Sequence, residues 1–357
     1  INYIKMKLEQ MDVQIGKNLV GNSHRCFVAL EPSATYRNFD EAKSMVDAVS
    51  DAGAQAIKFQ TFLPGDVGRI IEDKEIMIKF GTKDGEKQES VFEALKRREL
   101  EEKEWEQLIK YTKEKDLGFI TAPYFPETVD FLIRNNVHAL KISKGDINNV
   151  LLIDKVAKTG LPIILDAREK LDEIDNAIKI CERNNNQKIV ILHCPSGYPA
   201  ENSGINLRAI EFIKNRYKYP VGFADHSEGQ VMNFAAIGYG ATMIEKTITF
   251  DKYTENVEHL MSIEIEELEN FVKNVRMIDD AKGTSDVLQV SRVEETARRS
   301  IVSKVDIKKG QEITLENIDY KRPGNAGISC AEGFEILKHK AKVDIKKNTF
   351  IKWEMID

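Results

Sequence analysis

Eight short apolar runs, each followed by a stretch with helical periodicity, most constrain what this chain can fold into. The runs are rich in β-branched residues and almost continuously apolar, as parallel strands covered by helices are. They lie at residues 26–31, 54–62, 118–124, 139–143, 162–166, 188–194, 221–226 and 241–249. The amphipathic stretches between them include residues 39–53, 171–184, 206–217 and 264–278. Eight such pairs in about 250 residues predict a (β/α)8 TIM barrel. An open doubly wound sheet is the alternative, but no glycine-rich phosphate fingerprint follows a strand.

The character of the sequence changes after the last of these pairs. We predict the barrel over residues 1–282, a polar linker over 283–298 and a small β-rich domain over 299–357, where short runs alternate with KKGQ and KKNT turns. A domain of that size has a marginal core, so we expect it to dock on the barrel or on a second subunit. Within the barrel, residues 66–100 are too long for a simple loop, which predicts a functional insertion or lid.

Composition excludes several classes of protein. The 357 residues include 52 basic and 58 acidic side chains, so the net charge is −6. With no basic stripe, a nucleic-acid surface is not expected. No window approaches the ~18 uncharged apolar residues of a membrane helix, so no membrane role is expected. The first residues, INYIKMKLEQMDVQ, do not follow the pattern of a secretory signal. Four scattered cysteines are typical of reduced thiols, and we expect a cytoplasmic protein.

Two lysines lie inside predicted strands. Lys58 and Lys141 are each flanked by apolar residues, which predicts that their side chains point into the barrel. A buried lysine needs an anion beside it. Two interpretations stay open: a structural ion pair with Glu31, Asp166 or Glu245, or a clamp for the carboxylate or phosphate of an anionic substrate.

A histidine and a tyrosine also follow strand ends, where barrels carry their chemistry. His226 comes directly after a carboxylate, which is typical of an oriented metal ligand, although a satisfied polar residue fits as well. His259 lies past the last strand and could bend back over the pocket. Pro199 keeps Tyr198 out of the helical region. Its hydroxyl could bond a sugar over the mouth, or its ring could simply pack in a loop.

Motifs at these strand ends carry a family resemblance. AGAQAIKFQTF resembles AGADAVKFQTF, LKISKGDINNVLLI resembles LKIASGEITNLPLL, LHCPSGYPA resembles LHCTSEYPA, and VGFADHSEG resembles VGYSDHTxG. These are motifs of the sialic acid (N-acetylneuraminate) synthase family, NeuB-like enzymes that condense phosphoenolpyruvate with an N-acylated amino-sugar such as N-acetylmannosamine. The later RRSIV and RPGNAGIS segments resemble the SAF (antifreeze-like) domain of that family. The resemblance implies an α/β fold, a TIM barrel followed by an SAF domain.

The resemblance also implies roles by position. Lys58, Thr121 and Lys141 fall where the family binds phosphoenolpyruvate, and Glu31 is the candidate acid or base. His226 matches one of two histidines that hold a divalent metal, Mn or Mg. Arg322 matches an arginine that reaches into the partner subunit's active site, which implies a domain-swapped homodimer. Further substrate contacts are expected from Gln60, Asp146, Ser196, Tyr198 and Glu258.

The chain departs from the family pattern inside the site. Thr247 stands where the family has its second metal histidine, so His226 would hold a metal only with weaker help. Three serines that help to bind phosphoenolpyruvate are replaced by Lys144, Asp166 and Ala224. Lysine retains the capacity to bind an anion, whereas aspartate removes it. Such coordinated changes predict an altered pocket, in which Lys144 and Asp166 still face the substrate.

Three functions therefore stay open. The first is the family reaction, with a nonulosonic (sialic-type) acid as product and phosphate released. The second is a metal-free pyruvate lyase in which Lys144, crowded by Lys141, forms a Schiff base. The third is a non-catalytic paralogue that binds sugar or scaffolds a pathway.

Overall fold

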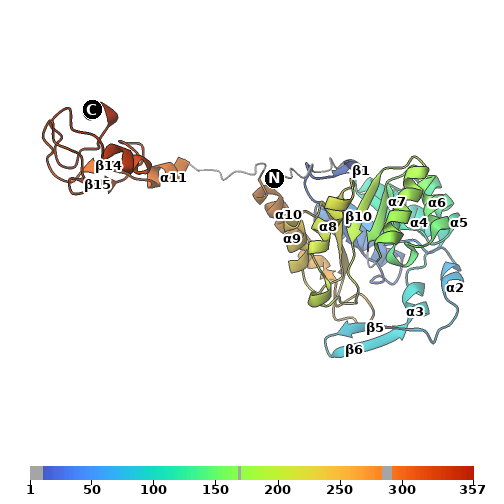
Figure 1. Cartoon of the computed structure of the whole chain (residues 1–357). Helices are drawn as coiled ribbons and strands as arrows, with labels where there is room; N and C mark the ends of the chain where they lie inside the picture. Colours follow the sequence, from blue (N-terminus) through green and yellow to red (C-terminus); the bar gives the residue numbers. More distant parts are fainter. Residues whose placement is uncertain (1–10, 168–169, 284–291) are drawn as a thin grey trace. The chain divides into compact units, whose positions relative to one another are not determined.

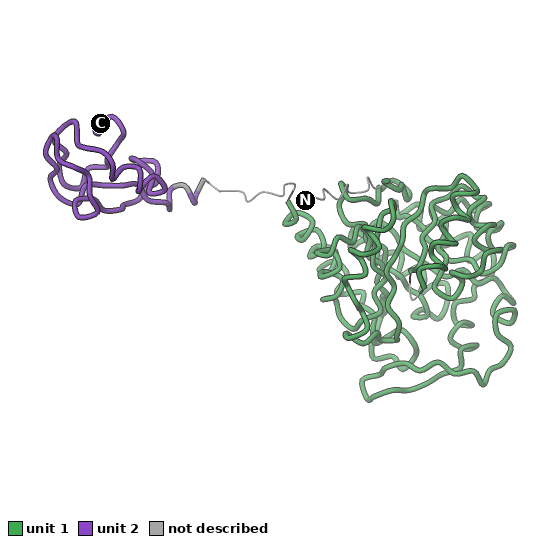
Figure 2. The backbone as a smooth tube through the Cα atoms, viewed as in Figure 1, with its two compact units in different colours: residues 1–283 green, residues 284–357 purple. Residues whose placement is uncertain are grey.

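Eight parallel strands close into a barrel in the first of the chain's two units, residues 1–283 (Figures 1 and 2). The structure is a computed structural model, and it describes residues 11–167, 170–283 and 292–357. The strands are β3 (Phe27–Glu31), β4 (Ala56–Gln60), β7 (Gly118–Ala122), β8 (Ala139–Ile142), β9 (Ile163–Ala167), β10 (Ile189–His193), β11 (Val221–Asp225) and β12 (Met243–Thr249). Neighbours pair in this order, and β12 pairs again with β3, which closes the ring. The predicted TIM barrel is confirmed. Seven of the eight apolar runs contain one strand each, and β9 extends one residue beyond the remaining run, 162–166.

Helices cover the outside of the ring. They are α1 (Phe39–Asp51), α4 (Glu102–Glu114), α5 (Pro126–Arg134), α6 (Val150–Ala157), α7 (Leu171–Arg183), α8 (Arg208–Arg216), α9 (Val231–Gly238) and α10 (Leu268–Ala281). α1 illustrates why they form. The side chain of Asn38 caps its first turn by accepting from the backbone of Glu41, and Val46 and Val49 are buried against the strands. The helix ends at Asp51, two residues before Gly53 turns the chain at φ 75°.

A hairpin of β1 (Val13–Ile15) and β2 (Asn18–Val20) covers the amino-terminal end of the barrel. Val13, Ile15 and Val20 are buried in the same cluster as Phe27 and Ala56, which are barrel-lining residues near strand starts. The sequence analysis did not predict this hairpin.

The insertion predicted at residues 66–100 folds over the other end of the barrel (Figure 1). It comprises α2 (Asp66–Ile70), the antiparallel strands β5 (Met77–Thr82) and β6 (Gly85–Ser90), and α3 (Val91–Lys96). Phe80 packs with Ala34, Ala94 and Val257 in a cluster separate from the barrel core. The insertion therefore makes its own contacts with the loops at the carboxyl ends of the strands.

The second unit, residues 284–357, has its own core. Its regular elements are α11 (Arg292–Ala297), β14 (Ser300–Ser303), β15 (Ile318–Lys321) and α12 (Gly333–Ile336), and β14 and β15 pair antiparallel. Ile301, Ile307 and Ile351 are among its fully buried residues. Of the predicted linker, residues 284–291 lie outside the described residues, and α11 occupies most of the remainder. In the described parts of the chain, no helix combines the length and the apolar character that crossing a membrane requires.

Candidate active site

Two cavities lie at the carboxyl ends of the barrel strands. The inner cavity, about 40 Å³, is lined by strand-end residues from around the ring. They are Glu31, Ser33, Lys58, Gln60, Lys141, Ser143, Lys144, Asp166, Tyr198, His226, Glu245, Thr247 and Glu258. The outer cavity, about 410 Å³, shares five of these residues and is otherwise lined by the insertion and by Tyr124, Asp146 and Val257. The barrel thus gathers most of the predicted site residues around one continuous pair of cavities.

The two predicted lysines point into the barrel and form buried ion pairs. Lys58 pairs with Glu31. Lys141 pairs with Glu245 and lies 3.0 Å from an oxygen of Asp166. The structural ion pairs considered from the sequence are therefore present, and they occupy the wall of a cavity.

Burial and these lysines move the pKa values of the carboxyl groups in opposite directions. Burial opposes ionisation of Glu31, but Lys58 and Lys141 outweigh it and hold its pKa well below the usual range. Burial raises the pKa of Glu245 to about 7, against the lowering effect of Lys141. Burial also disfavours the charge of Lys141, yet Asp166 and Glu245 raise its pKa well above the ordinary value. The same cavity therefore holds an ionised carboxylate and a carboxyl group that gains and loses its proton near neutral pH.

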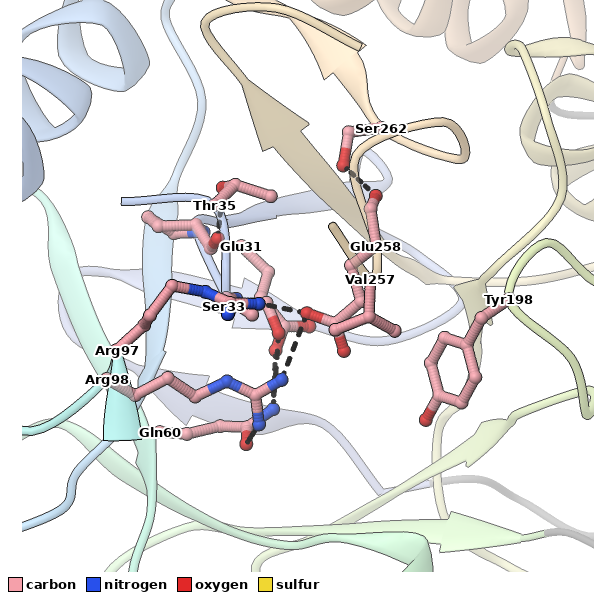
Figure 3. A network of polar contacts seen from close by, with 12 residues as sticks. Glu31, Ser33, Thr35, Gln60, Arg97, Arg98, Tyr198, Val257, Glu258 and Ser262 are labelled. Atoms are coloured by element: carbon pink, nitrogen blue, oxygen red, sulfur yellow. Dashed lines mark hydrogen bonds and ion pairs between the residues drawn. The ribbon is translucent and has the colours of Figure 1, made fainter. Parts of the chain in front are cut away.

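Gln60 joins the two cavities through a network of polar contacts (Figure 3). Its amide nitrogen donates to Glu31 over 3.2 Å, and its carbonyl oxygen accepts from Arg98 over 2.6 Å and from the hydroxyl of Tyr124 over 2.8 Å. Arg98 also pairs with Glu258 over 3.2 Å (Figure 3). Gln60 and Glu258, both predicted to hold substrate, are thus fixed by one guanidinium.

Lys144, Tyr198 and His226 form a stack on the opposite wall. Lys144 begins a short 3-10 helix, Lys144–Asp146, and its backbone N–H donates to Asp166 over 3.2 Å. Its ammonium donates to the hydroxyl of Tyr198 and lies 4.2 Å from the centre of that ring. The ring of Tyr198 stacks on His226 at 5.3 Å. Burial, and then the charge of Lys144, lower the pKa of His226 well below its ordinary value, so this imidazole is neutral.

Some predicted site residues lie elsewhere. Thr121 is fully buried, bonds to Thr61 over 2.7 Å, and lines neither cavity. Ser196 is exposed in the loop after β10 and also lines neither cavity. His259 bonds to Thr249 and lines a separate side cavity, so it does not bend over the site. Arg322 is exposed at the end of β15 in the second unit.

A divalent metal does not fit the donors of this site. Among residues 11–167, 170–283 and 292–357, no group of three His, Cys, Asp or Glu side chains is arranged to hold an ion. His226 offers one buried nitrogen, Nδ1, that has no hydrogen-bond partner. Thr247 lies beside it, because β11 and β12 pair Asp225 with Lys246, the residues immediately before each of them. The described residues of this site therefore do not fit the predicted metal.

The sequence analysis missed Arg98 and Tyr124 as site residues. Arg98 lies within the polar insertion, in the segment KRRE, and nothing in that segment distinguishes the buried Arg98 from the half-buried Arg97 or the exposed Lys96. Tyr124 lies two residues after the end of β7, and its place just beyond a strand end was a usable signal.

The fold and the two cavities define a (β/α)8 barrel with a site rich in lysine and carboxyl groups at the strand ends. Residues 45–287 match the NeuB family, and residues 298–357 match the SAF domain. The chain belongs to the NeuB family.

Similar proteins cover nearly the whole chain. An uncharacterised protein of Methanocaldococcus jannaschii is 34% identical, over 96% of this chain and 98% of its own length. The N,N'-diacetyllegionaminic acid synthase of Legionella pneumophila is 30% identical, over 94% of this chain and 96% of its own. A crystal structure of the N-acetylneuraminic acid synthetase of Leptospira borgpetersenii, in complex with citrate, superposes with a TM-score of 0.69 at 26% identity, over 80% of this chain and 94% of that one.

Proposed function

We propose that this chain is a cytoplasmic nonulosonic acid synthase that condenses phosphoenolpyruvate with an N-acetylmannosamine-like amino-sugar and releases phosphate. The observation that supports this most is the set of three lysines, Lys58, Lys141 and Lys144, on the wall of the inner cavity. A donor that carries both a carboxylate and a phosphate needs such a concentration of ammonium groups. Two of the relatives named above, those of Legionella pneumophila and Leptospira borgpetersenii, are synthases of acids of the proposed product class.

The two cavities suit two substrates. Glu31 and Asp166 lie where they neutralise Lys58 and Lys141. An anionic donor that enters the inner cavity would take over those lysines. The larger outer cavity has room for the sugar, whose hydroxyls would meet Gln60, Asp146, Tyr198 and Glu258.

The opposed pKa values of two carboxyl groups supply an acid and a base. The enol carbon of the donor attacks the sugar aldehyde, the carbonyl electron pair moves to oxygen, and an oxocarbenium forms at the donor's second carbon. Once the donor has taken over Lys58, Glu31 accepts a proton from the water that adds there. Glu245 protonates the phosphate as its C–O bond breaks, and the new hydroxyl returns that proton as it becomes a ketone.

The second unit suits a role in a homodimer. The SAF match covers Arg322, and the resemblance implies that this arginine completes the site of a partner subunit in a domain-swapped pair. This part of the proposal rests on the family alone.

The test is phosphate release from phosphoenolpyruvate with a panel of N-acetylmannosamine-type sugars, with and without Mn²⁺ and EDTA. The purified full chain should release phosphate with at least one sugar, and Lys58→Met should abolish the release. Lys179→Met, which removes the same charge from the exposed face of α7, is the matched control and should leave it unchanged. No release under any condition would leave the non-catalytic alternative.

The lyase alternative makes a different prediction. Lys144 donates to Tyr198, and this contact favours the ammonium over the nucleophilic amine that a Schiff base requires. We therefore expect no covalent adduct when the chain is incubated with pyruvate and borohydride. An adduct on Lys144, detected by mass spectrometry, would support the lyase instead.

A further inference from the structure

The ammonium of Lys144 lies near His226, which is the one histidine of the described residues that lines the inner cavity and which the resemblance makes a metal ligand. The ammonium of Lys144 contacts the hydroxyl and the ring of Tyr198, and that ring stacks directly on His226. All three side chains line the inner cavity, and Lys144 and Tyr198 also line the outer one. The charge therefore lies at the junction where donor and acceptor would meet.

The surroundings of His226 disfavour a divalent cation. Four carboxyl groups line the cavity with it, and each already has a cationic partner: Lys58 for Glu31, Lys141 for both Asp166 and Glu245, and Arg98 for Glu258. A dication here would lie near several ammonium groups in a half-buried site, where like charges repel more strongly than in water. Thr247 offers a hydroxyl next to His226 rather than a second imidazole.

We propose that this chain works without a divalent metal, and that Lys144, acting with the hydroxyl of Tyr198, supplies the positive charge at the carbonyl oxygen of the sugar. The proposal rests on the proposed function for its reaction. A phenol that accepts from an ammonium is itself a stronger donor, because hydrogen bonds in a chain polarise one another. The pair thus forms a donor aimed into the space between the two cavities.

The proton balance closes without another reactant. As the carbon–carbon bond forms, the carbonyl electron pair moves to the sugar oxygen, which takes the phenol proton of Tyr198. Lys144 replaces that proton through its hydrogen bond to the phenol oxygen. The amine is then reprotonated from solvent, and Glu31 releases to solvent the proton it took from water.

The first test is Mn²⁺ binding to the full chain after dialysis against EDTA, without substrate, followed by the electron paramagnetic resonance signal of free Mn²⁺. We expect the signal to follow the buffer blank. One Mn²⁺ bound per chain at micromolar concentration would overturn the proposal. This measurement needs no activity, so it is independent of whether the proposed reaction occurs.

Variants of Lys144 and Thr247 test why the site does not bind the ion. Thr247→His alone, which retains the ammonium, should not bind Mn²⁺, whereas the double variant Lys144→Ser/Thr247→His should bind one ion per chain. Circular dichroism establishes that each variant is folded. A folded double variant that binds no ion, or a single variant that binds one, would contradict this account.

Kinetics separate carbonyl activation from simple binding of the donor. With any sugar that supports phosphate release, wild type should keep its full rate in EDTA. Lys144→Ser should lower kcat about 100-fold, in addition to the rise in the KM for phosphoenolpyruvate that the loss of one of three ammonium groups causes, and Lys179→Ser is the charge-matched control. A raised KM with unchanged kcat would mean that Lys144 only holds the donor, and would overturn its assignment. If wild type releases no phosphate at all, the proposed function fails while the Mn²⁺ result still stands.

Discussion

The carboxyl groups of Glu31 and Glu245 share one cavity, yet their pKa values move in opposite directions. The difference follows from their partners. Glu31 has a lysine largely to itself, whereas Glu245 shares Lys141 with Asp166 and leaves one buried oxygen without a hydrogen bond. Neither glutamate differs from its neighbours in sequence pattern, so only the folded arrangement separates an acid from a base.

Glu245 should make stability depend on pH. Its folded pKa of about 7 is above the ordinary value of 4.5, so its contribution is fully present below pH 4.5 and is lost as pH rises through 7. Glu245→Gln cannot ionise and should remove this loss, on the order of 2–3 kcal/mol. Urea unfolding of wild type and variant at pH 5 and pH 8 measures it. An equal difference between the two proteins at both pH values would contradict the assignment.

His226 is expected to act in the reaction rather than in folding. Its buried Nδ1 has no partner in the described structure, so removal of the ring breaks no hydrogen bond made by that atom. His226→Ala should lower phosphate release at least about 100-fold. It also removes a ring that stacks on Tyr198, but it should lower the free energy of unfolding less than a variant that breaks a buried hydrogen bond.

His193 provides the control for that experiment. It ends the neighbouring strand β10, but its ring bonds to the backbone of Ile205 over 2.6 Å and lines neither cavity. His193→Ala should therefore destabilise the chain and leave kcat nearly unchanged. The reverse pattern for the two histidines would contradict their assignments.

At the scale of elements, the β5–β6 hairpin is attached to the site through Glu89. Its carboxylate binds Arg97 through two contacts, of 2.8 and 3.0 Å, and accepts from the backbone of Val257 over 2.6 Å. Val257 precedes Glu258, which has a left-handed φ of 76° and holds Arg98. The hairpin thus fixes a strained loop that lines the outer cavity.

Glu89→Gln should raise the KM for the amino-sugar several-fold and affect the KM for phosphoenolpyruvate little, because the contacts of Glu89 fix the wall of the outer cavity. Glu86→Gln is the matched control: Glu86 lies on the same strand and forms only an exposed pair with Lys79. Steady-state kinetics with each substrate varied in turn measures both. Equal effects of the two variants would contradict a specific role for Glu89.

The barrel strands were predictable from sequence because parallel strands buried on both faces are continuous apolar runs. The β1–β2 and β5–β6 hairpins were not predicted from the sequence. β5 and β6 are mostly exposed, and of their residues only Phe80 is buried. Their position depends on contacts with the loops that follow other strands.

The site was also predictable only in part. Lys58 and Lys141 were found because a charged residue inside an apolar run is conspicuous, whereas Arg98 lies among other charged residues.

At the scale of the whole molecule, the predicted domain swap can be tested by mixing defective chains. Arg322→Ala and His226→Ala should each be inactive. If Arg322 serves the partner's site, a mixed dimer contains one intact site, and random pairing should restore about a quarter of wild-type activity. Phosphate release after joint refolding measures this. No recovery would show that each chain completes its own site, or that Arg322 takes no part.

The β1–β2 hairpin, which covers the amino-terminal end of the barrel, has a consequence for the order of substrate binding. Because the amino-terminal end is covered, substrates and products must pass through the opening at the carboxyl ends of the strands, beneath the β5–β6 hairpin. The donor, which occupies the inner cavity, must therefore bind before the sugar fills the outer cavity. Substrate binding should then follow a compulsory order, in which phosphoenolpyruvate binds first and the sugar binds second.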